Sequence, residues 1–177
     1  MTNTSPISAL PAELTAEVCA HDRIMRYRRS GAGMPILLMF PVPETAHLAD
    51  ELTRALAGNF RLIVPELPPS TNATDWLAEF LEGLGTSAVT LIAAGPLCMP
   101  AIELALRDDD QVSRLVLIPD GDANDAVRDE SLITTFGASQ IPALIVRPGL
   151  GSRETAAVIV RFVESGSAGT GGAHGNS

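Results

Sequence analysis

Three kinds of side chain in this sequence could take part in chemistry: a cysteine, a histidine and several carboxylates. Cys98 follows the apolar run 88–94, at the start of a segment with helical periodicity. Because a helix N-terminus can lower the pKa of a thiol, Cys98 is a candidate nucleophile. The favoured alternative is a small buried residue that packs a helix onto a sheet, since no histidine stands near Cys98 in the sequence.

His47 falls in the first turn of another helical segment, close to where the preceding strand is expected to end. The carboxylates of Glu44, Glu66, Asp120 and Asp122 lie on neighbouring loops at the same expected edge, where open α/β sheets bind ligands. A carboxylate–histidine pair there could act as a general base in a proton abstraction or a lyase reaction. A surface histidine on a polar helix face is the favoured alternative.

No metal site or cofactor is predicted. The acidic segment 120–130 lacks the glycine and the terminal glutamate of a calcium loop, and Cys19 and Cys98 have no zinc-site spacing. His21 and His174 stand in segments that indicate no role for them.

The elements that must position these groups alternate along the chain. Short apolar runs bounded by turn residues are typical of buried parallel strands, and they occupy 35–40, 61–67, 88–94, 114–120 and 142–148. Segments with helical period lie between and after them, at 44–58, 71–85, 96–109 and 154–166. The pattern predicts the α/β fold class: a three-layer α/β/α sandwich around a mainly parallel sheet.

The remaining segments complete the prediction. Residues 17–31 alternate as one edge strand that ends at the Gly31–Gly33 turn, and 121–140 is a connection that crosses back over the sheet. In the helix at 44–58, one stripe holds Leu48, Leu52, Leu56 and Ala55. The expected domains are an irregular arm at 1–16, a single domain at 17–166, and a disordered Gly/Ser-rich tail at 167–177.

Charge and hydropathy exclude some classes of partner. The formal net charge is −9, and all 12 basic residues are arginine without a strong cluster, so neither nucleic acid nor an anionic membrane surface is expected. No apolar run of about 20 residues could span a bilayer. The first residues have no positively charged start and no long apolar segment of a secretory signal, so the expected compartment is the cytoplasm.

The order of the motifs resembles the α/β-hydrolase superfamily over residues 20–165. The stretches that carry the resemblance are RYRRSGAGMPILLMFP, NFRLIVPELP with its Pro65-Glu66 pair, DWLAEFLEGLGTSAVTLIAAG, QVSRLVLIPDG and IPALIVRPG. The resemblance implies a hydrolase-like core of five to six strands that lacks the family's last strand and any large cap.

At the position of the family's nucleophile elbow, G-x-S-x-G, this chain departs from the pattern. Gly95 stands where the serine would be, and Pro96, which has no backbone N–H, stands where the family provides an oxyanion donor. No carboxylate follows 142–147 before Glu154, and the triad histidine would lie beyond the last expected helix. The resemblance thus implies a degenerate member, a pseudoenzyme without the Ser-His-Asp triad and without ordinary serine hydrolase activity.

Three functions remain open. The first is a non-catalytic protein that binds a small apolar or acyl ligand, or a protein partner, at a pocket lined by Phe40, Pro41, Gly95, Pro96, Leu97 and Met99. The second is an unorthodox hydrolase or lyase that uses His47 with a loop carboxylate such as Glu66 or Asp120, or that uses Cys98. The third is an interaction module that forms a homodimer through the open sheet edge at 142–147.

Overall fold

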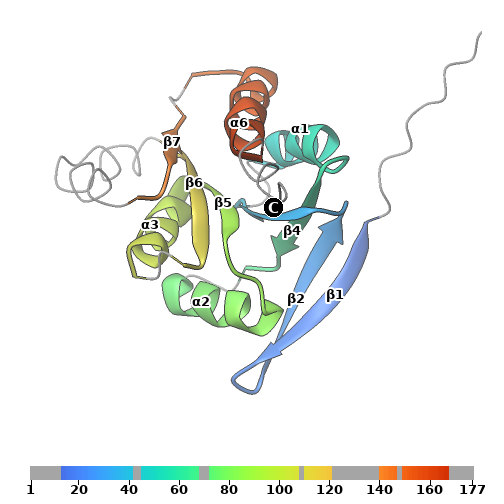
Figure 1. The fold of residues 1–177 in the computed structure, drawn as a ribbon, viewed down its shortest axis with the longest axis vertical. Helices are drawn as coiled ribbons and strands as arrows, with labels where there is room; N and C mark the ends of the chain where they lie inside the picture. Colours follow the sequence, from blue (N-terminus) through green and yellow to red (C-terminus); the bar gives the residue numbers. More distant parts are fainter. Residues whose placement is uncertain are drawn as a thin grey trace, which may run out of the picture.

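The computed structural model describes residues 13–41, 45–67, 72–107, 110–120, 140–146 and 149–167. Its strands are β1 (Leu14–Ala20), β2 (Arg23–Ser30), β3 (Met34–Met39), β4 (Phe60–Pro65), β5 (Val89–Ala94), β6 (Val112–Ile118) and β7 (Ala143–Ile145) (Figure 1). The described helices are α1 (Ala46–Leu56), α2 (Ala73–Leu84), α3 (Cys98–Arg107) and α6 (Ser152–Ser167), and a short 3-10 helix spans Gly95–Leu97.

The strands form one sheet in the order β1-β2-β4-β3-β5-β6-β7. The five strands from β4 to β7 in this order run parallel to one another, whereas β2 pairs antiparallel with both β1 and β4. A mainly parallel sheet needs crossover connections, and the helices supply them between β3 and β4, β4 and β5, and β5 and β6. The α/β fold class is therefore confirmed.

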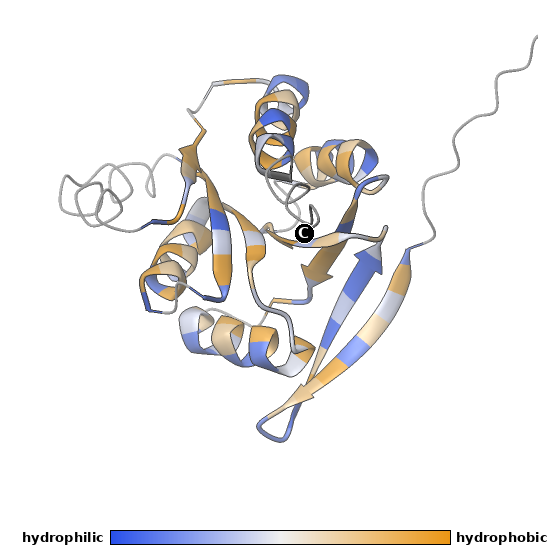
Figure 2. Ribbon diagram, viewed as in Figure 1, coloured by the Kyte–Doolittle hydropathy of each residue, from blue (hydrophilic) through white to orange (hydrophobic). Residues whose placement is uncertain are grey.

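Each face of the sheet has its own hydrophobic core, because successive residues of a strand point to opposite sides. Leu37 and Leu91 face the cluster formed with α2 and α3, whereas Ile36 and Ile92 face the cluster formed with α1 and α6. Figure 2 shows the resulting concentration of hydrophobic residues along the central strands. The three layers follow from strands that are apolar on both faces.

The sheet has seven strands, so the expectation of five to six is wrong. Segment 17–31 folds as the β1–β2 hairpin instead of as one edge strand, with β1 at the edge and starting at Leu14. His21 and Asp22 make the turn, with φ of 46° and 62°. Positive φ at both central residues defines the type I′ turn, whose twist matches that of the flanking strands. Ala55, predicted on the buried stripe of α1, is exposed.

The strand β7 lies at the other edge of the sheet and is three residues long. Its Ile145 side chain is 41% exposed. The expected self-association through this edge stays a prediction. The predicted connection at 121–140, the arm up to residue 12 and the tail from 168 lie almost entirely outside the described residues. No described helix is both long and apolar enough to cross a membrane.

Candidate functional site

The strand–turn–helix corner at residues 94–98 has the geometry that the sequence predicts. Ala94 ends β5 in an extended conformation, and Gly95 then takes a φ of +57°. Pro96 lies in the first turn of the 3-10 helix, where its missing N–H leaves no backbone bond unmade. The residue at the apex of the corner is thus a glycine in the left-handed backbone conformation, and it places no side chain there.

A carboxylate stands beside this apex. A Cβ atom added to Gly95 would lie 2.9 Å from Oδ2 of Asp120 and 3.5 Å from Cγ of Pro41. Asp120 follows β6, the strand next to β5 in the sheet, so neighbouring carboxyl ends bring the two residues together. Of the four candidate catalytic residues, Asp120 and Cys98 are therefore the two that the fold brings to the corner.

The Cys98 side chain is buried at the start of α3, and its thiol donates a hydrogen bond to the carbonyl oxygen of Ala93 at 3.5 Å. Burial raises the pKa of Cys98 from 9.0 to about 11; a backbone hydrogen bond with Ile118 opposes this rise, and the negative charge of Asp120 adds to it. The neutral thiol therefore predominates at neutral pH, which does not favour nucleophilic attack. Because the pKa of Cys98 is higher in the folded state, the buried neutral thiol contributes its full stability below pH 9. This contribution declines as the pH rises toward 11.

The two cysteines are expected to react at very different rates with a maleimide at pH 7. Cys19 is exposed and Cys98 is buried, so one equivalent should react fast and the second at least about tenfold more slowly. Mass spectrometry after timed quenching measures both, and the variant Cys19→Ser should remove the fast phase. Two fast equivalents in the native protein would contradict this assignment of Cys98.

The other proposed catalytic pair is not assembled. His47 is an exposed residue near the start of α1, and no ion pair or hydrogen bond joins it to a carboxylate among the residues that the structure describes. Glu66 follows β4 and is exposed, and its backbone N–H donates to the carbonyl oxygen of Arg26 at 2.9 Å. Neither residue has the geometry of a general-base pair in this structure.

Beside the corner lies a cavity of about 750 Å³, which we call the elbow cavity. This volume is within the range of about 300–1,000 Å³ that is usual for small-molecule sites. The described residues around it come from the ends of β3 and β4, from the starts of α1 and α2, from β2 and from the corner itself: Arg28, Met39, Phe40, Pro41, Thr45, Ala46, Ala49, Asp50, Val64, Pro65, Glu66, Leu67, Ala73, Trp76, Pro96, Leu97 and Pro100.

The chemistry of this wall is mainly apolar. Four prolines contribute rigid surface without N–H donors, and the hydroxyl of Thr45 already donates to the carbonyl oxygen of Pro41 at 2.7 Å. The described lining residues include no serine, cysteine or histidine. Within the described part of the chain, no group of three or more metal-ligating side chains could hold an ion.

Four of the six residues predicted to line a pocket lie on the elbow cavity: Phe40, Pro41, Pro96 and Leu97. Gly95 is buried against Asp120 and Pro41 instead, and Met99 packs on the core cluster beneath α3. Trp76, which is not among the residues predicted for the pocket, is 8% exposed and also lines the cavity. Ligands commonly bind at the carboxyl ends of parallel strands, and this rule predicts the part of the cavity beside the corner. It does not predict the part of the wall that α2 supplies.

No protein-family model and no curated protein matches this sequence. Solved structures do match. An epoxide hydrolase, CorEH, aligns with a TM-score of 0.52 and 21% identity over 60% of this chain and 42% of its own. The haloalkane dehalogenase DatA from Agrobacterium tumefaciens C58 aligns with a TM-score of 0.52 and 21% identity over 60% of this chain and 41% of its own. The haloalkane dehalogenase DbeA from Bradyrhizobium elkani USDA94 aligns with a TM-score of 0.52 and 19% identity over 60% of this chain and 41% of its own.

These likenesses show an α/β-hydrolase-like fold. They agree with the resemblance drawn from the order of the strands and turns, and they cover 60% of this chain. The chain spans about two fifths of the length of these structures, since the aligned shares of those chains are 42% and 41%. At 21% identity the likeness extends to the fold and not to the chemistry of the site.

Proposed function

We propose that this protein binds a small, predominantly apolar ligand in the elbow cavity and does not form a covalent intermediate with it. The observation that carries the proposal is the cavity of about 750 Å³ beside a corner that presents Gly95 and Pro96. A cavity supplies binding energy through apolar contact, whereas acyl transfer also needs a nucleophile and a donor for the oxyanion. Neither group is offered by these two residues.

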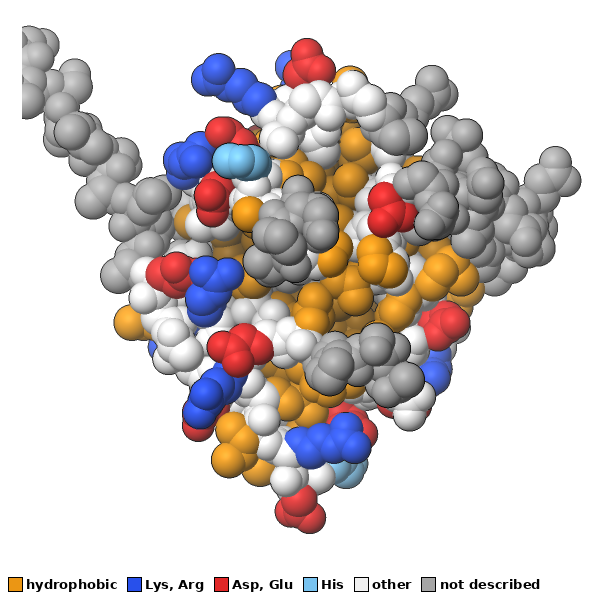
Figure 3. Space-filling view, turned by 180° about the vertical axis from the view of Figure 1, so that it is seen from behind, with side chains coloured by type: hydrophobic (Ala, Val, Ile, Leu, Met, Phe, Trp, Pro, Cys, Tyr) orange, Lys and Arg blue, Asp and Glu red, His pale blue; other side chains and the backbone are white. Residues whose placement is uncertain are grey.

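The lining of the elbow cavity is consistent with an apolar ligand, because its described residues other than Arg28, Thr45, Asp50 and Glu66 have apolar side chains. Figure 3 shows hydrophobic side chains gathered across the middle of one face of the molecule, with charged side chains around them. We therefore place the ligand in the elbow cavity, against the apolar side chains of its lining.

Trp76 makes the proposal directly testable because it is the only tryptophan of the chain and lines the elbow cavity. Titration with 1-octanol should change the emission of Trp76 in a saturable manner. The variant Ala46→Phe should weaken this binding by at least about tenfold, because Ala46 lines the cavity at the start of α1 and the ring would fill part of it. Calorimetric titration gives the affinity independently of the fluorescence.

The matched control is Ala55→Phe, which adds the same ring to the same helix at an exposed position away from the cavity lining. It should leave the affinity for 1-octanol unchanged. Equal loss in both variants, or no saturable change in the wild type, contradicts the proposal. So does turnover of p-nitrophenyl butyrate, an epoxide or a haloalkane by the wild-type protein, which would favour the unorthodox enzyme instead.

A further inference from the structure

The wall of the elbow cavity carries more negative than positive side chains. Asp50 of α1 and Glu66 after β4 both line it. Neither carboxylate has an ion-pair partner in the described ranges of the chain. The wall therefore carries two negative charges that form no ion pair with an arginine of the described ranges.

The cation on the same wall has a partner. The guanidinium of Arg28 lies 2.9 Å from Oε1 of Glu13, so its charge is already balanced by a carboxylate outside the cavity lining. An anionic ligand at Arg28 would compete with Glu13 for the guanidinium, in a cavity whose wall also carries Asp50 and Glu66. Negative charges on the wall of a cavity oppose the binding of an anion there.

The charge of the whole chain also favours cations. The whole chain carries a formal net charge of −9, which raises the local concentration of cations around it. An aromatic side chain, Trp76, is also available on the wall, and indole rings attract organic cations.

We infer that the ligand of the elbow cavity is an apolar amine or other organic cation, with its hydrocarbon part in the cavity and its positive charge at Asp50 and Glu66. This inference rests on the proposed function and specifies its ligand class. It distinguishes the amine from the acyl carboxylate that the fold resemblance alone would also allow.

Three probes with the same eight-carbon tail test the inference: n-octylammonium, 1-octanol and octanoate. At pH 7 the amine is protonated and the acid is ionised, so the probes differ in the charge at one end. We expect the affinity to follow the order n-octylammonium, 1-octanol, octanoate, with at least about fivefold between the first and the last at low salt. Raising the ionic strength should reduce this difference.

Variants identify the charges that matter. Asp50→Asn and Glu66→Gln should each weaken the binding of n-octylammonium by about two- to fivefold, as expected for exposed ion pairs, and should weaken the binding of 1-octanol less than that of the amine. Glu82→Gln is the matched control, since it removes a charge from an exposed residue of α2 outside the cavity lining and should change neither affinity.

The possible results distinguish a failure of this inference from a failure of the proposed function. Failure of all three probes to bind would overturn the proposed function. Binding of 1-octanol without preference for the cation would overturn only the inference of charge. Tightest binding of octanoate, lost in Arg28→Gln, would also overturn the inference and assign the cavity to an acyl carboxylate.

Discussion

Gly95→Ser, the substitution that restores a hydroxyl to the corner, is expected to destabilise the protein by about 2–3 kcal/mol and to create no ester hydrolysis. The φ of Gly95 is +57°, a conformation that costs a residue with a Cβ about 1–2 kcal/mol. The new Cβ would also lie 2.9 Å from Oδ2 of Asp120, so the carboxylate must move away from the corner. Denaturant unfolding measures the loss of stability.

The absence of activity follows from the neighbouring residue. Pro96 has no N–H to stabilise an oxyanion, and removal of one such donor typically costs about 10²–10³ in rate. Gly95→Ala is the control, because it introduces the same strain without the hydroxyl. Hydrolysis of p-nitrophenyl butyrate by Gly95→Ser above the rate of Gly95→Ala would contradict the expectation that the corner cannot support ordinary serine hydrolase activity.

The contact with Asp120 has a test of its own within the same series. If the carboxylate contributes to the cost, then Gly95→Ala should be less destabilising when Asp120 is also replaced by alanine. A double-mutant cycle between Gly95→Ala and Asp120→Ala measures this coupling directly. Strictly additive losses would show that the backbone conformation alone accounts for the cost at Gly95.

The sheet could be predicted because its central strands have apolar residues on both faces. Runs such as Ile36–Met39 and Leu91–Ala94 are buried throughout, and turn residues mark their ends. The β1–β2 hairpin was missed because its turn has His21 and Asp22 at positive φ, where Asn-Gly or Asp-Gly is the usual signal. Here the pairing of the two strands imposes positive φ on His21 and Asp22. A local sequence pattern cannot show this, because these residue types adopt that conformation less readily than glycine does.

The candidate site was predictable only in part, for a related reason. Phe40, Pro41, Pro96 and Leu97 could be placed because they follow parallel strands, whose carboxyl ends share one edge. Trp76 could not, because its exposure to the cavity depends on how α2 packs across the sheet. A tryptophan at helical spacing predicts a core residue equally well whether or not a cavity opens beside it.

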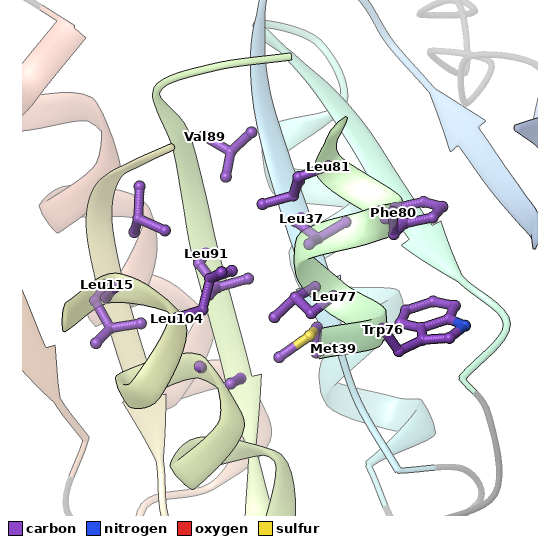
Figure 4. Packing of buried hydrophobic residues seen from close by; sticks show 14 of the residues in the cluster. Leu37, Met39, Trp76, Leu77, Phe80, Leu81, Val89, Leu91, Leu104 and Leu115 are labelled. Carbon is purple, nitrogen blue, oxygen red and sulfur yellow. The ribbon is translucent and has the colours of Figure 1, made fainter. Parts of the chain in front are cut away.

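Phe80→Ala is expected to destabilise the protein by about 3–5 kcal/mol and to disturb the elbow cavity as well. Phe80 is fully buried in α2 and stacks on Trp76, with 5.2 Å between the ring centroids (Figure 4). It also makes an edge-to-face contact with Tyr27 of β2, with 5.7 Å between the ring centroids. One ring thus joins the hairpin to the helix that supplies the cavity wall. Without it, the indole of Trp76 loses the surface against which it is held.

Ile159→Ala separates the effect on the cavity from the effect on stability. Ile159 is fully buried in α6 and belongs to the core on the other face of the sheet, so its loss should cost about 2–5 kcal/mol. Under native conditions, the emission of Trp76 and the affinity for 1-octanol should change in Phe80→Ala and stay unchanged in Ile159→Ala. The milder Phe80→Leu serves if the alanine variant does not fold. Because both variants weaken a buried core, an equal effect on ligand affinity would mean that global stability, and not the position of Trp76, maintains the cavity.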